Sequence, residues 1–306
     1  MNNLRTNHRD RRAGSDRRDA KSLIFSPVRY TRGYQSDANN ADNVSRAHLM
    51  RATDITSAIR RGEFTIDYQP RIAANGGAIA AMEALVRWHH PHLGLLDPDK
   101  FIPTAESSDA IIELGEWVLI TSLKKLNAWI NSGYEPGKIA VNISARQIAD
   151  PAFADIVLQA LSVSDVAGDR LELELTESTQ IIDMPAAIRT MNKVSAAGVR
   201  FSIDDFGRGY ASLDYLRQLP VEAVKIDQSF IQGVTTGLRD VTLLRALTTM
   251  IADIGLRVVA EGIENQDQLN ALRDMACDEL QGFVFSRPLT DHDAGHLLST
   301  CPAYAV

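Results

Sequence analysis

Cysteine is scarce in this chain, whose 306 residues include only Cys277 and Cys301. The two cysteines do not show the spacing of metal ligands, and two alone cannot form the framework of a small disulfide-stabilised protein. Such cysteine usage is typical of a reducing compartment. We therefore expect a cytoplasmic protein.

Long apolar runs are also missing. The sequence contains no stretch of 18 or more apolar residues, which predicts that no transmembrane segment is present. The early part of the chain is rich in arginine, but its longest apolar run is Leu23-Ile24-Phe25. A signal peptide needs a longer apolar core, so export is not expected.

Large apolar residues are few in residues 1–45, where Arg, Asp, Asn and Ser dominate. A segment of this composition cannot bury a core, and we expect a disordered basic N-terminal arm there. Residues 1–33 carry a net charge of +6, whereas residues 34–306 carry −13. The acidic body argues against broad nucleic-acid binding, while the arm could meet a protein partner, a nucleic acid or an anionic membrane surface.

Residues 46–306 are expected to form one large domain, because the chain as a whole is 45% hydrophobic and 23% charged, as ordinary globular proteins are. The domain begins with apolar residues at helical spacing, and Gly62 is a plausible stop for this helix. Two strand-like runs, 65–74 and 78–88, then flank Asn75-Gly76-Gly77. That turn sequence predicts a β-hairpin.

The rest of the domain alternates between strand-like and helical patterns. The strand-like runs are KIAVNIS, RLELELTE, VRFSIDD, EAVKID, LRVVAEG and ELQGFVF, and helical patterns lie at 109–132, 151–163, 185–197, 240–254 and 265–275. This alternation predicts an α/β fold, a (β/α)8 TIM-like barrel, and the opening hairpin makes its first strand antiparallel to the rest. An open doubly wound sheet is the alternative, although no Gly-rich phosphate loop follows the first strand.

A polar side chain stands near the C-terminal end of each strand-like run, where a strand buried on both faces should be apolar. These residues are Glu83, Asn142, Glu174, Asp204, Asp205, Lys225, Glu261 and Gln281. A charged residue inside a barrel must be paired, metal-bound or near water. Active sites of parallel barrels lie at the C-terminal ends of the strands, so we predict that these side chains converge on one rim.

The residue types at this rim predict a metal site. Five carboxylates and an amide oxygen are hard ligands that suit Mg²⁺, Mn²⁺ or Ca²⁺, and divalent cations would relieve their mutual repulsion. Adjacent Asp204 and Asp205 could serve two ions, and two metals about 3.5–4 Å apart activate water in phosphoester displacement. Taken singly, each residue has a plainer interpretation, such as a helix cap for Asn142 or a half-exposed strand around Glu174. Their joint occurrence favours the site.

Ten motifs follow one another along roughly residues 50–300. They are YQP at 68–70, MEALVRW at 82–88, FIPTAE at 101–106, GEWVL at 115–119, VNISA at 141–145, ELTES at 174–178, DDFGRGYASL at 204–213, KIDQSFI at 225–231, AEGIE at 260–264 and QGFVFSRPL at 281–289. In this order they resemble the EAL family of bacterial cyclic di-GMP phosphodiesterases, whose signature is Glu83-Ala84-Leu85 here. The ordered set is far more specific than the signature alone.

The resemblance implies a role for each matching position. The metal ligands that it implies are Glu83, Asn142, Glu174 and Asp204 for a first ion, Asp205 for a second, and Glu261 as a ligand or water-orienting acid. The implied catalytic residues are Lys225, beside the attacking water, with Glu83 and Glu261. The implied substrate-binding residues are Gln69, Leu85, Arg87, Asp227 and Gln281. Glu177 corresponds to the acid that anchors the loop after Asp205.

The activity that the resemblance implies is hydrolysis of cyclic di-GMP to linear pGpG, with two Mg²⁺ or Mn²⁺ ions as cofactor and Ca²⁺ as an inhibitor. It also implies a homodimer. The sequence contains no GGDEF cyclase motif, so we expect a stand-alone domain. A catalytically inactive receptor for the same nucleotide is one alternative, and a scaffold whose arm binds a partner is another. Every metal-ligand position is kept, which favours the enzyme. Whether Lys225 or a metal-bound hydroxide takes the proton stays open.

Three positions depart from the family pattern. Arg71 stands where Lys or an aliphatic residue is common, Arg208 where a small residue or Thr is common, and Ala211 where Ser is common. We expect none of them to touch a metal ligand. Arg87 could also be a structural ion-pair partner instead of a phosphate ligand. The histidines of HHPHLG at 89–94 resemble a metal cluster but are more simply a turn.

Overall fold

The structure is a computed structural model. It describes residues 51–176, 181–208, 213–235, 237–300, 303–304 and 306. The expected basic arm at residues 1–45, the first residues of the expected domain and the loop anchor Glu177 lie outside the described residues. Among the helices that are described, none is long and apolar enough to cross a membrane.

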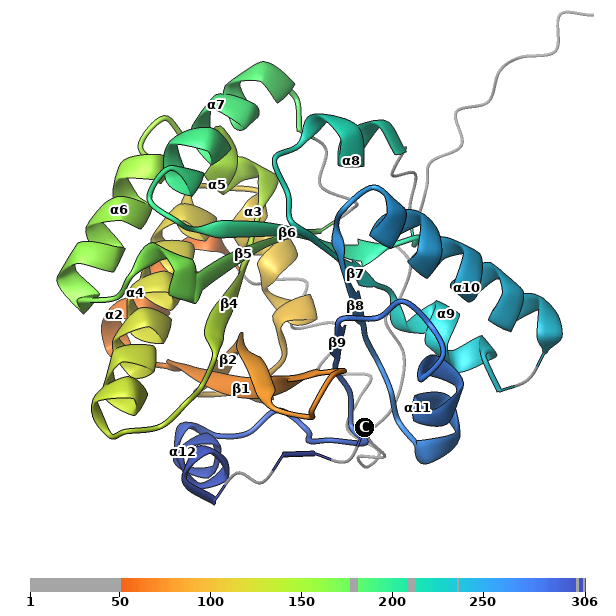
Figure 1. The fold of residues 1–306 in the computed structure, drawn as a ribbon. Coiled ribbons are helices and arrows are strands. Elements are labelled where there is room, and N and C mark those ends of the chain that lie inside the picture. The colour runs from red at the N-terminus through yellow and green to blue at the C-terminus, as the bar shows by residue number, and fades with distance from the viewer. Residues whose placement is uncertain (1–50, 177–180, 209–212, 236, 301–302, 305) are drawn as a thin grey trace, which may run out of the picture. The chain divides into compact units, whose positions relative to one another are not determined.

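Eight strands close into a barrel (Figure 1). They are β1 (Phe64–Ala73), β2 (Ile79–His90), β4 (Lys138–Ile143), β5 (Leu171–Thr176), β6 (Arg200–Phe206), β7 (Ala223–Ile226), β8 (Arg257–Ala260) and β9 (Glu279–Leu280). Strand β1 is antiparallel to both of its neighbours, β2 and β9, whereas the pairs from β2 and β4 through β8 and β9 are parallel. The predicted (β/α)8 barrel with an antiparallel first strand is therefore confirmed. A short strand, β3 (Gly94–Leu96), extends the outer end of β2.

Helices cover the outside of the barrel (Figure 1). They are α2 (Ala52–Arg61), α3 (Ile102–Glu106), α4 (Ala110–Asn131), α5 (Ala145–Ala149), α6 (Phe153–Ser164), α7 (Met184–Ser195), α8 (Leu213–Gln218), α9 (Gln228–Gly233), α10 (Leu238–Asp253), α11 (Gln266–Leu272) and α12 (Asp291–Thr300), with 3-10 turns η1 (Pro98–Lys100) and η2 (Gly168–Arg170). The five predicted helices coincide with α4, α6, α7, α10 and α11 to within three residues at each end. The predicted stop at Gly62 is also confirmed, since this residue caps α2 with a φ of 68°.

The opening hairpin fixes which side chains of β1 and β2 face the barrel interior. Its turn needs glycine at Gly77, where φ is 69° and a Cβ would lie 1.9 Å from the carbonyl oxygen of Tyr304. The resulting register sets Gln69 directly opposite Glu83. Because side chains alternate between the two faces of a strand, this pair belongs to the same face.

Strand β5 shows how the interior becomes polar. Leu171, Leu173 and Leu175 are at most 1% exposed and pack in the apolar core, while Glu172 and Glu174 are 0% exposed and lie on the opposite face. The half-exposed strand that the alternation also allowed is wrong, because both faces are buried. Both glutamates are therefore placed inside the barrel.

The last predicted strand is much shorter than expected. The run ELQGFVF at 279–285 is a strand only at Glu279–Leu280. The chain turns immediately afterwards, since the amide of Phe285 donates to the carbonyl of Gly282 at 3.1 Å. The turn leaves Gln281 directly at the end of β9, where its side chain faces the rim.

Candidate metal centre and active site

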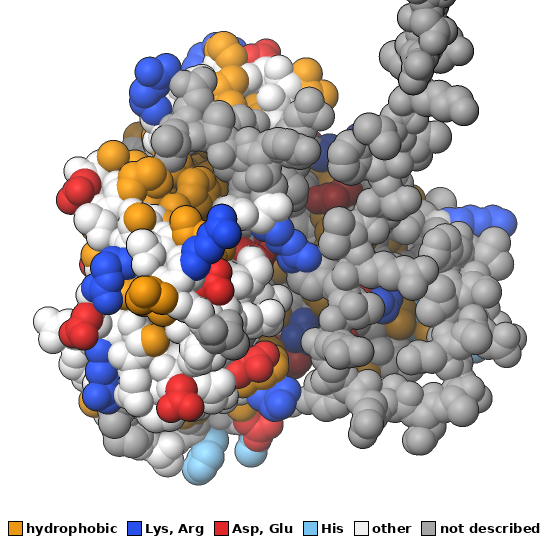
Figure 2. Space-filling model, turned by 90° about the vertical axis from the view of Figure 1, so that its right-hand side faces the viewer, with side chains coloured by type: hydrophobic (Ala, Val, Ile, Leu, Met, Phe, Trp, Pro, Cys, Tyr) orange, Lys and Arg blue, Asp and Glu red, His pale blue; other side chains and the backbone are white. Residues whose placement is uncertain are grey.

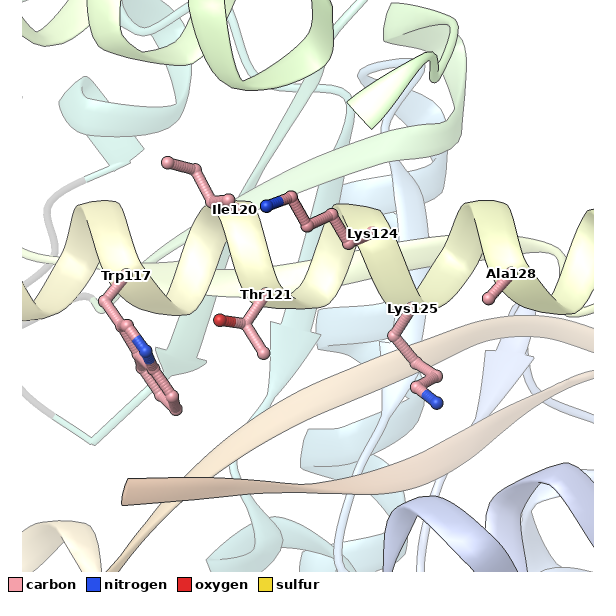
Figure 3. Close-up of a pocket in the computed structure, with 6 residues that line it drawn as sticks. All are labelled: Trp117, Ile120, Thr121, Lys124, Lys125 and Ala128. Carbon is pink, nitrogen blue, oxygen red and sulfur yellow. The ribbon is translucent and has the colours of Figure 1, made fainter. Parts of the chain in front are cut away.

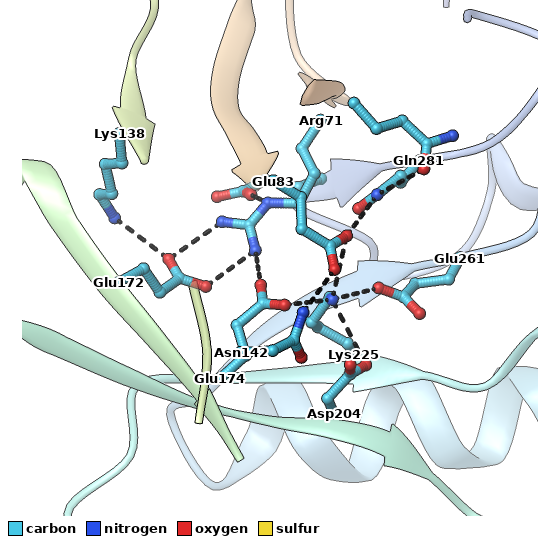
Figure 4. A network of polar contacts seen from close by, with 12 residues as sticks. Arg71, Glu83, Lys138, Asn142, Glu172, Glu174, Asp204, Lys225, Glu261 and Gln281 are labelled. Carbon is cyan, nitrogen blue, oxygen red and sulfur yellow. Dashed lines mark hydrogen bonds and ion pairs between the residues drawn. The ribbon is translucent and has the colours of Figure 1, made fainter. Parts of the chain in front are cut away.

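The polar strand ends converge as the sequence predicted. Glu83, Asn142, Glu174, Asp204 and Lys225 come from β2, β4, β5, β6 and β7, and Glu261 and Gln281 follow directly after β8 and β9. Their side chains meet at one end of the barrel interior (Figure 4).

Lys225 lies at the centre of this rim, and its side chain is 1% exposed. Its ammonium Nζ is 2.5 Å from Oε2 of Glu174 and 2.7 Å from Oε1 of Glu261. Two further carboxylates contact it, Asp204 through Oδ1 at 3.4 Å and Glu83 through Oε2 at 3.5 Å. Four carboxylates from separate parts of the chain thus surround a single buried ammonium.

Two amide side chains hold Glu83. Nδ2 of Asn142 donates to its Oε1 at 2.9 Å, and Nε2 of Gln281 donates to its Oε2 at 2.6 Å. The same nitrogen of Gln281 lies 3.1 Å from Oε1 of Gln69. The helix-cap alternative for Asn142 is wrong, because Ser144 caps α5. Side chains from β4 and from the end of β9 therefore order Glu83 at the rim.

The donor set at the rim fits a divalent cation. Carboxylate oxygens of Glu83, Glu174 and Asp204 lie within 4.8 Å of one another, and Glu261 joins them through the shared ammonium. Four carboxylates beside one ammonium are a surplus of acidic groups, which a bound cation would neutralise. In addition, Oε1 of the buried Gln281 has no hydrogen-bond partner among the described residues. Hard oxygen donors of this kind suit divalent cations such as Mg²⁺, Mn²⁺ or Ca²⁺.

The pKa shifts at the rim have the same electrostatic cause. Burial raises the pKa of Glu174 well above its usual value, and Glu83 and Asp204 add to the rise while Lys225 opposes it. Burial and the charge of Asp204 likewise raise the pKa of Glu261. Burial would lower the pKa of Lys225, but the surrounding carboxylates raise it well above its usual value. The ammonium is therefore charged and the carboxylates compete for it.

Asp205 has an unusual backbone conformation for a residue other than glycine, with a φ of 58°. The register between β6 and β7 shifts between Ile203 and Phe206, so Asp205 belongs to an irregular strand end. Its backbone amide donates to Oδ1 of Asp204 at 2.7 Å. Burial, followed by the charge of Asp204, raises the pKa of Asp205 to about 6. Left-handed backbone at such a position is strained and concentrates at functional sites.

The expected substrate face continues outward from Glu83 along β2. Leu85 and Arg87 follow at alternate positions, so all three share one face of the strand. Nε of Arg87 lies 3.0 Å from Oδ2 of Asp67 and 3.6 Å from Oδ1 of Asp97. The structural ion pair that the sequence left open for Arg87 is thus present, next to the rim.

Asp227 lies just after β7 and is 3% exposed. Its Oδ1 accepts a hydrogen bond from the amide of Ser229 at 2.9 Å and caps α9. Its other oxygen lies 3.9 Å from Nη1 of Arg208, one of the three departures from the family pattern. The side chain is therefore fixed at the same end of the barrel as Lys225, two residues earlier.

The prediction that Arg71 contacts no metal-ligand position is wrong. Its guanidinium is 0% exposed, and its Nη1 donates to Oε1 of Glu174 at 2.8 Å. The physical reason is its position in the hairpin, two residues from Gln69 and on the same interior face. The signal was present in the sequence, since a charged residue inside a buried strand must find a partner.

The histidine cluster is a turn, as the simpler interpretation had it. Nδ1 of His90 accepts hydrogen bonds from the amides of His92 and Leu93, both at 3.2 Å. His89 faces away from them, with its Nε2 3.0 Å from the hydroxyl of Thr65. One ring nitrogen of His90 and one of His89 are thus engaged locally at the outer end of β2.

A separate hollow of about 460 Å³ lies along one face of α4, as Figure 3 shows. Its lining residues are Trp117, Ile120, Thr121, Lys124, Lys125 and Ala128. They offer two ammonium groups and one hydroxyl, but no carboxylate, so this hollow has none of the chemistry of the rim. On the face shown in Figure 2, acidic and basic side chains are interspersed over the described surface, beside groups of hydrophobic side chains.

Comparison with known proteins agrees with this geometry. The EAL domain matches residues 52–288. MucR of Pseudomonas aeruginosa, a bifunctional diguanylate cyclase/cyclic di-GMP phosphodiesterase, is 37% identical over 257 residues, which cover 84% of this chain and 38% of MucR. The cyclic di-GMP phosphodiesterase NbdA of the same species is 40% identical over 258 residues, which cover 82% of this chain and 33% of NbdA. The chain thus spans between a third and two fifths of the length of these relatives.

A solved structure supports the same assignment. The PaMucR phosphodiesterase in complex with c-di-GMP superposes with a TM-score of 0.74 at 38% identity, over 79% of this chain and 98% of that chain. Because the family match alone extends over more than half of the sequence, the chain belongs to the EAL domain family.

Proposed function

We propose that this chain hydrolyses cyclic di-GMP to linear pGpG at the carboxylate rim, with the help of divalent cations. The observation that carries the proposal is the convergence of Glu83, Glu174, Asp204 and Glu261 on Lys225. Family membership and the cyclic di-GMP phosphodiesterases among the relatives support it. The surplus of negative charge supports the need for cations.

The residues that would hold the cations are those whose oxygens face the rim. We assign Glu83, Asn142, Glu174 and Asp204 to one ion, Asp205 to a second, and Glu261 to a ligand or to the water beside it. Mg²⁺ or Mn²⁺ fits this set, whereas Ca²⁺ takes more ligands at longer distances and should inhibit. When bound, such cations activate water and neutralise charge on the oxygens of an in-line phosphoester displacement.

The protein's own side chains provide order and charge. Lys225 donates from its ammonium to Glu174 and lies against Glu261, so it orients both carboxylates and places a positive charge beside the attacked phosphate. Glu83 is kept in one orientation by two amides, which suits a group that must not move during the reaction. We therefore assign catalytic roles to Glu83, Lys225 and Glu261.

The substrate residues form a strip that begins at the rim. Gln69 and Gln281 are hydrogen-bonded to one another at 3.1 Å, and either amide could exchange that partner for the nucleotide. Leu85 offers an apolar surface for a base. Arg87 would contact a phosphate in place of the looser of its two acidic partners, at 3.6 Å. Asp227 would contact the nucleotide from its fixed position just after β7, two residues beyond Lys225.

The experiment that tests the proposal is direct. Purified protein is incubated with cyclic di-GMP and Mg²⁺ or Mn²⁺, and the nucleotides are separated. We expect pGpG to form, with much slower further cleavage, and we expect EDTA or Ca²⁺ to stop the reaction. Metal-loaded protein that binds the dinucleotide without ever linearising it would instead be a receptor.

Two further proposals concern assembly. We propose a homodimer in which the segment 206–214 and α10 couple the partner to Asp205, and a monomeric mass at micromolar concentration with full activity would contradict it. For the basic residues 1–45, we propose a protein partner or an anionic surface. Their deletion should leave the hydrolytic activity of the domain intact.

A further inference from the structure

Arg71 contacts three carboxylates, one at the rim and two below it. Besides its bond to Glu174, its Nη1 donates to Oε1 of Glu172 at 2.8 Å and its Nη2 donates to Oε2 of Glu172 at 3.0 Å. Its Nε lies 2.9 Å from Oε2 of Glu279. One guanidinium therefore joins two neighbouring interior positions of β5, Glu172 and Glu174 (Figure 4), and also contacts the first residue of β9.

The charges around Arg71 form a lower layer of the barrel interior. Arg257 contacts both Glu172 and Glu279, and Nζ of Lys138 lies 3.8 Å from Oε2 of Glu172. Three cations thus face two carboxylates in this layer. The lower layer therefore has one more positive than negative charge, and Arg71 is the cation of this layer that also contacts the rim, at Glu174.

The two oxygens of Glu174 are held from opposite sides. Oε1 is bound by Arg71 at 2.8 Å, whereas Oε2 lies 2.5 Å from Nζ of Lys225. Figure 4 shows the carboxylate between these two cations. Because Lys225 is the centre of the rim, Oε2 is the oxygen that faces the candidate cation site and Oε1 is the oxygen turned away from it.

We propose that Arg71 is a positioning residue for the divalent-cation site. It fixes Oε1 of Glu174 and thereby presents Oε2 to the cation in one orientation. The inference rests on the proposed function insofar as it takes the rim to bind a cation. A ligand's outer hydrogen-bond partner matters because its loss typically weakens metal binding about 10–100-fold.

The identity of the side chain matters for this task. Arginine has five N–H donors in a planar fork, which lets Arg71 donate to Glu172 and Glu174 together while its Nε lies 2.9 Å from Oε2 of Glu279. Lysine has one nitrogen and an aliphatic residue has none. With either of the residues common at this position in the family, the orientation of Glu174 would depend more on Lys225.

The test compares Glu172→Gln with the double variant Arg71→Met/Glu172→Gln. The double variant removes one positive and one negative charge, so the lower layer keeps its sum of charge. Glu172→Gln is the matched control, because Arg71 still reaches Glu174 in it. Mn²⁺ binding to the metal-stripped full chain is measured by titration calorimetry, and circular dichroism confirms folding. We expect about tenfold weaker Mn²⁺ binding in the double variant and less than about threefold in the control.

A purely structural role would give a different result. It would lower the unfolding temperature while leaving the Mn²⁺ affinity of the folded double variant equal to that of Glu172→Gln, and this outcome would overturn the proposal. If the double variant does not fold, Arg71→Lys keeps the charge but not the fork. We expect it to bind Mn²⁺ several-fold more weakly than the wild type, on the order of threefold. Unchanged affinity in Arg71→Lys would also overturn the proposal.

The same titrations separate this inference from the proposed function. Wild-type protein that binds Mn²⁺ but never linearises cyclic di-GMP would end the proposed function and leave the affinity comparison valid. Hydrolysis by the wild type with equal Mn²⁺ affinity in both variants would end the inference alone. A wild type that binds no Mn²⁺ would end both.

Discussion

Two layers of charged side chains lie inside the same barrel and differ in the sum of their charges. The rim layer contains Glu83, Glu174, Asp204 and Glu261 around Lys225. The lower layer contains Glu172 and Glu279 with Arg71, Arg257 and Lys138. The rim has four carboxylates for one cation, whereas the lower layer has more cations than carboxylates.

The difference teaches how to distinguish a functional cluster from a structural network. Both layers contain buried acidic and basic side chains, although Arg257 and Lys138 are 30% and 27% exposed, so burial alone does not separate the two layers. In the lower layer Glu172 and Glu279 share Arg71 and Arg257, so each carboxylate has at least two cations within ion-pair distance. At the rim four carboxylates share one ammonium. The carboxylates that this single positive charge does not neutralise can bind a cation. Arg71 is the contact between the two.

Removal of a carboxylate from the rim should have the largest effect on activity. In Asp204→Asn, a charged ligand becomes a neutral amide, and we expect turnover of cyclic di-GMP to fall about 10³-fold, with weaker Mn²⁺ binding. The fold should remain, because Lys225 keeps its contacts with Glu83, Glu174 and Glu261 and the substitution reduces the repulsion among the carboxylates. Hydrolysis rates and Mn²⁺ titrations measure both effects. Asp155→Asn, at an exposed ion pair on α6, is the control, and unchanged turnover in Asp204→Asn would remove this residue from the site.

Removal of a cation from the lower layer should instead act on stability. Arg71→Met leaves Glu172 and Glu279 buried with fewer cations, and we expect the free energy of unfolding to fall by about 3 kcal/mol, roughly 150-fold in the folding equilibrium. Denaturant unfolding of metal-free protein measures it. Lys124→Met, which removes an exposed cation from α4, should change stability by less than about 0.5 kcal/mol. A similar small change in Arg71→Met would mean that the lower layer is not a stabilising network.

The rim could be predicted from sequence because its signals are local. A polar residue at the end of a strand-like run is visible without knowledge of the partner strand, and the barrel topology then brings the strand ends together. The family motifs named the same positions. The shortness of β9 was not predictable in this way, since the run ELQGFVF at 279–285 has the composition of a strand and turns through contacts with the chain near Ile263.

The lower layer could not be predicted as a network, although its residues were visible. Arg71 meets Glu172 across 101 positions of sequence, and their pairing depends on how the strands are staggered around the barrel. Periodicity tells which face a side chain occupies but not its depth in the interior. The sequence shows that Arg71 departs from the family pattern, but its contact with Glu174 depends on the depth of both side chains in the barrel.

The loop anchor Glu177 tests whether the rim depends on order as well as on charge. It lies outside the described residues, three positions after Glu174, and its proposed role is to hold the loop that follows Asp205. Misplacement of a ligand by about 1 Å costs on the order of a hundredfold in rate, which is the loss we expect for Glu177→Ala. High Mn²⁺ should restore part of it, because Asp205 is still present.

Glu174→Ala is the matched comparison, since there a ligand itself is missing and metal should not restore activity. Activity and thermal unfolding are followed together during the metal titration. Wild-type activity in Glu177→Ala would refute the anchoring role. Equal losses in both variants at every metal concentration would make Glu177 a direct part of the site.

The smallest expected effect is a dependence of metal-free stability on pH that arises from the rim alone. Burial, with neighbouring carboxylates including Asp204, raises the pKa of Glu174 and Glu261, and burial together with Asp204 raises that of Asp205 to about 6. A carboxyl whose pKa is higher in the folded state binds more protons when folded than when unfolded. Its contribution to stability is therefore present at low pH and is lost as pH rises from the unfolded value through the folded one.

Other groups also titrate, so the informative quantity is the difference between wild type and Asp204→Asn. His90, whose pKa burial lowers, acts in the opposite direction below pH 6.5. The charges that shift its pKa are those of Glu63, His92, Asp54 and Arg61, so it should contribute equally to both proteins. Between pH 5 and 8, EDTA-treated wild type should lose about 1 kcal/mol more stability than Asp204→Asn, because the variant lacks the charge that raises its neighbours' pKa values. Saturating Mn²⁺ should remove the wild-type loss, since the cation replaces the protons. Chemical denaturation at several pH values measures the stability of the EDTA-treated wild type, of Asp204→Asn and of the wild type with Mn²⁺. Wild-type stability that rises more steeply with pH than that of the variant would mean that the rim carboxylates are already compensated without a metal, and the contrast between the two layers would be lost.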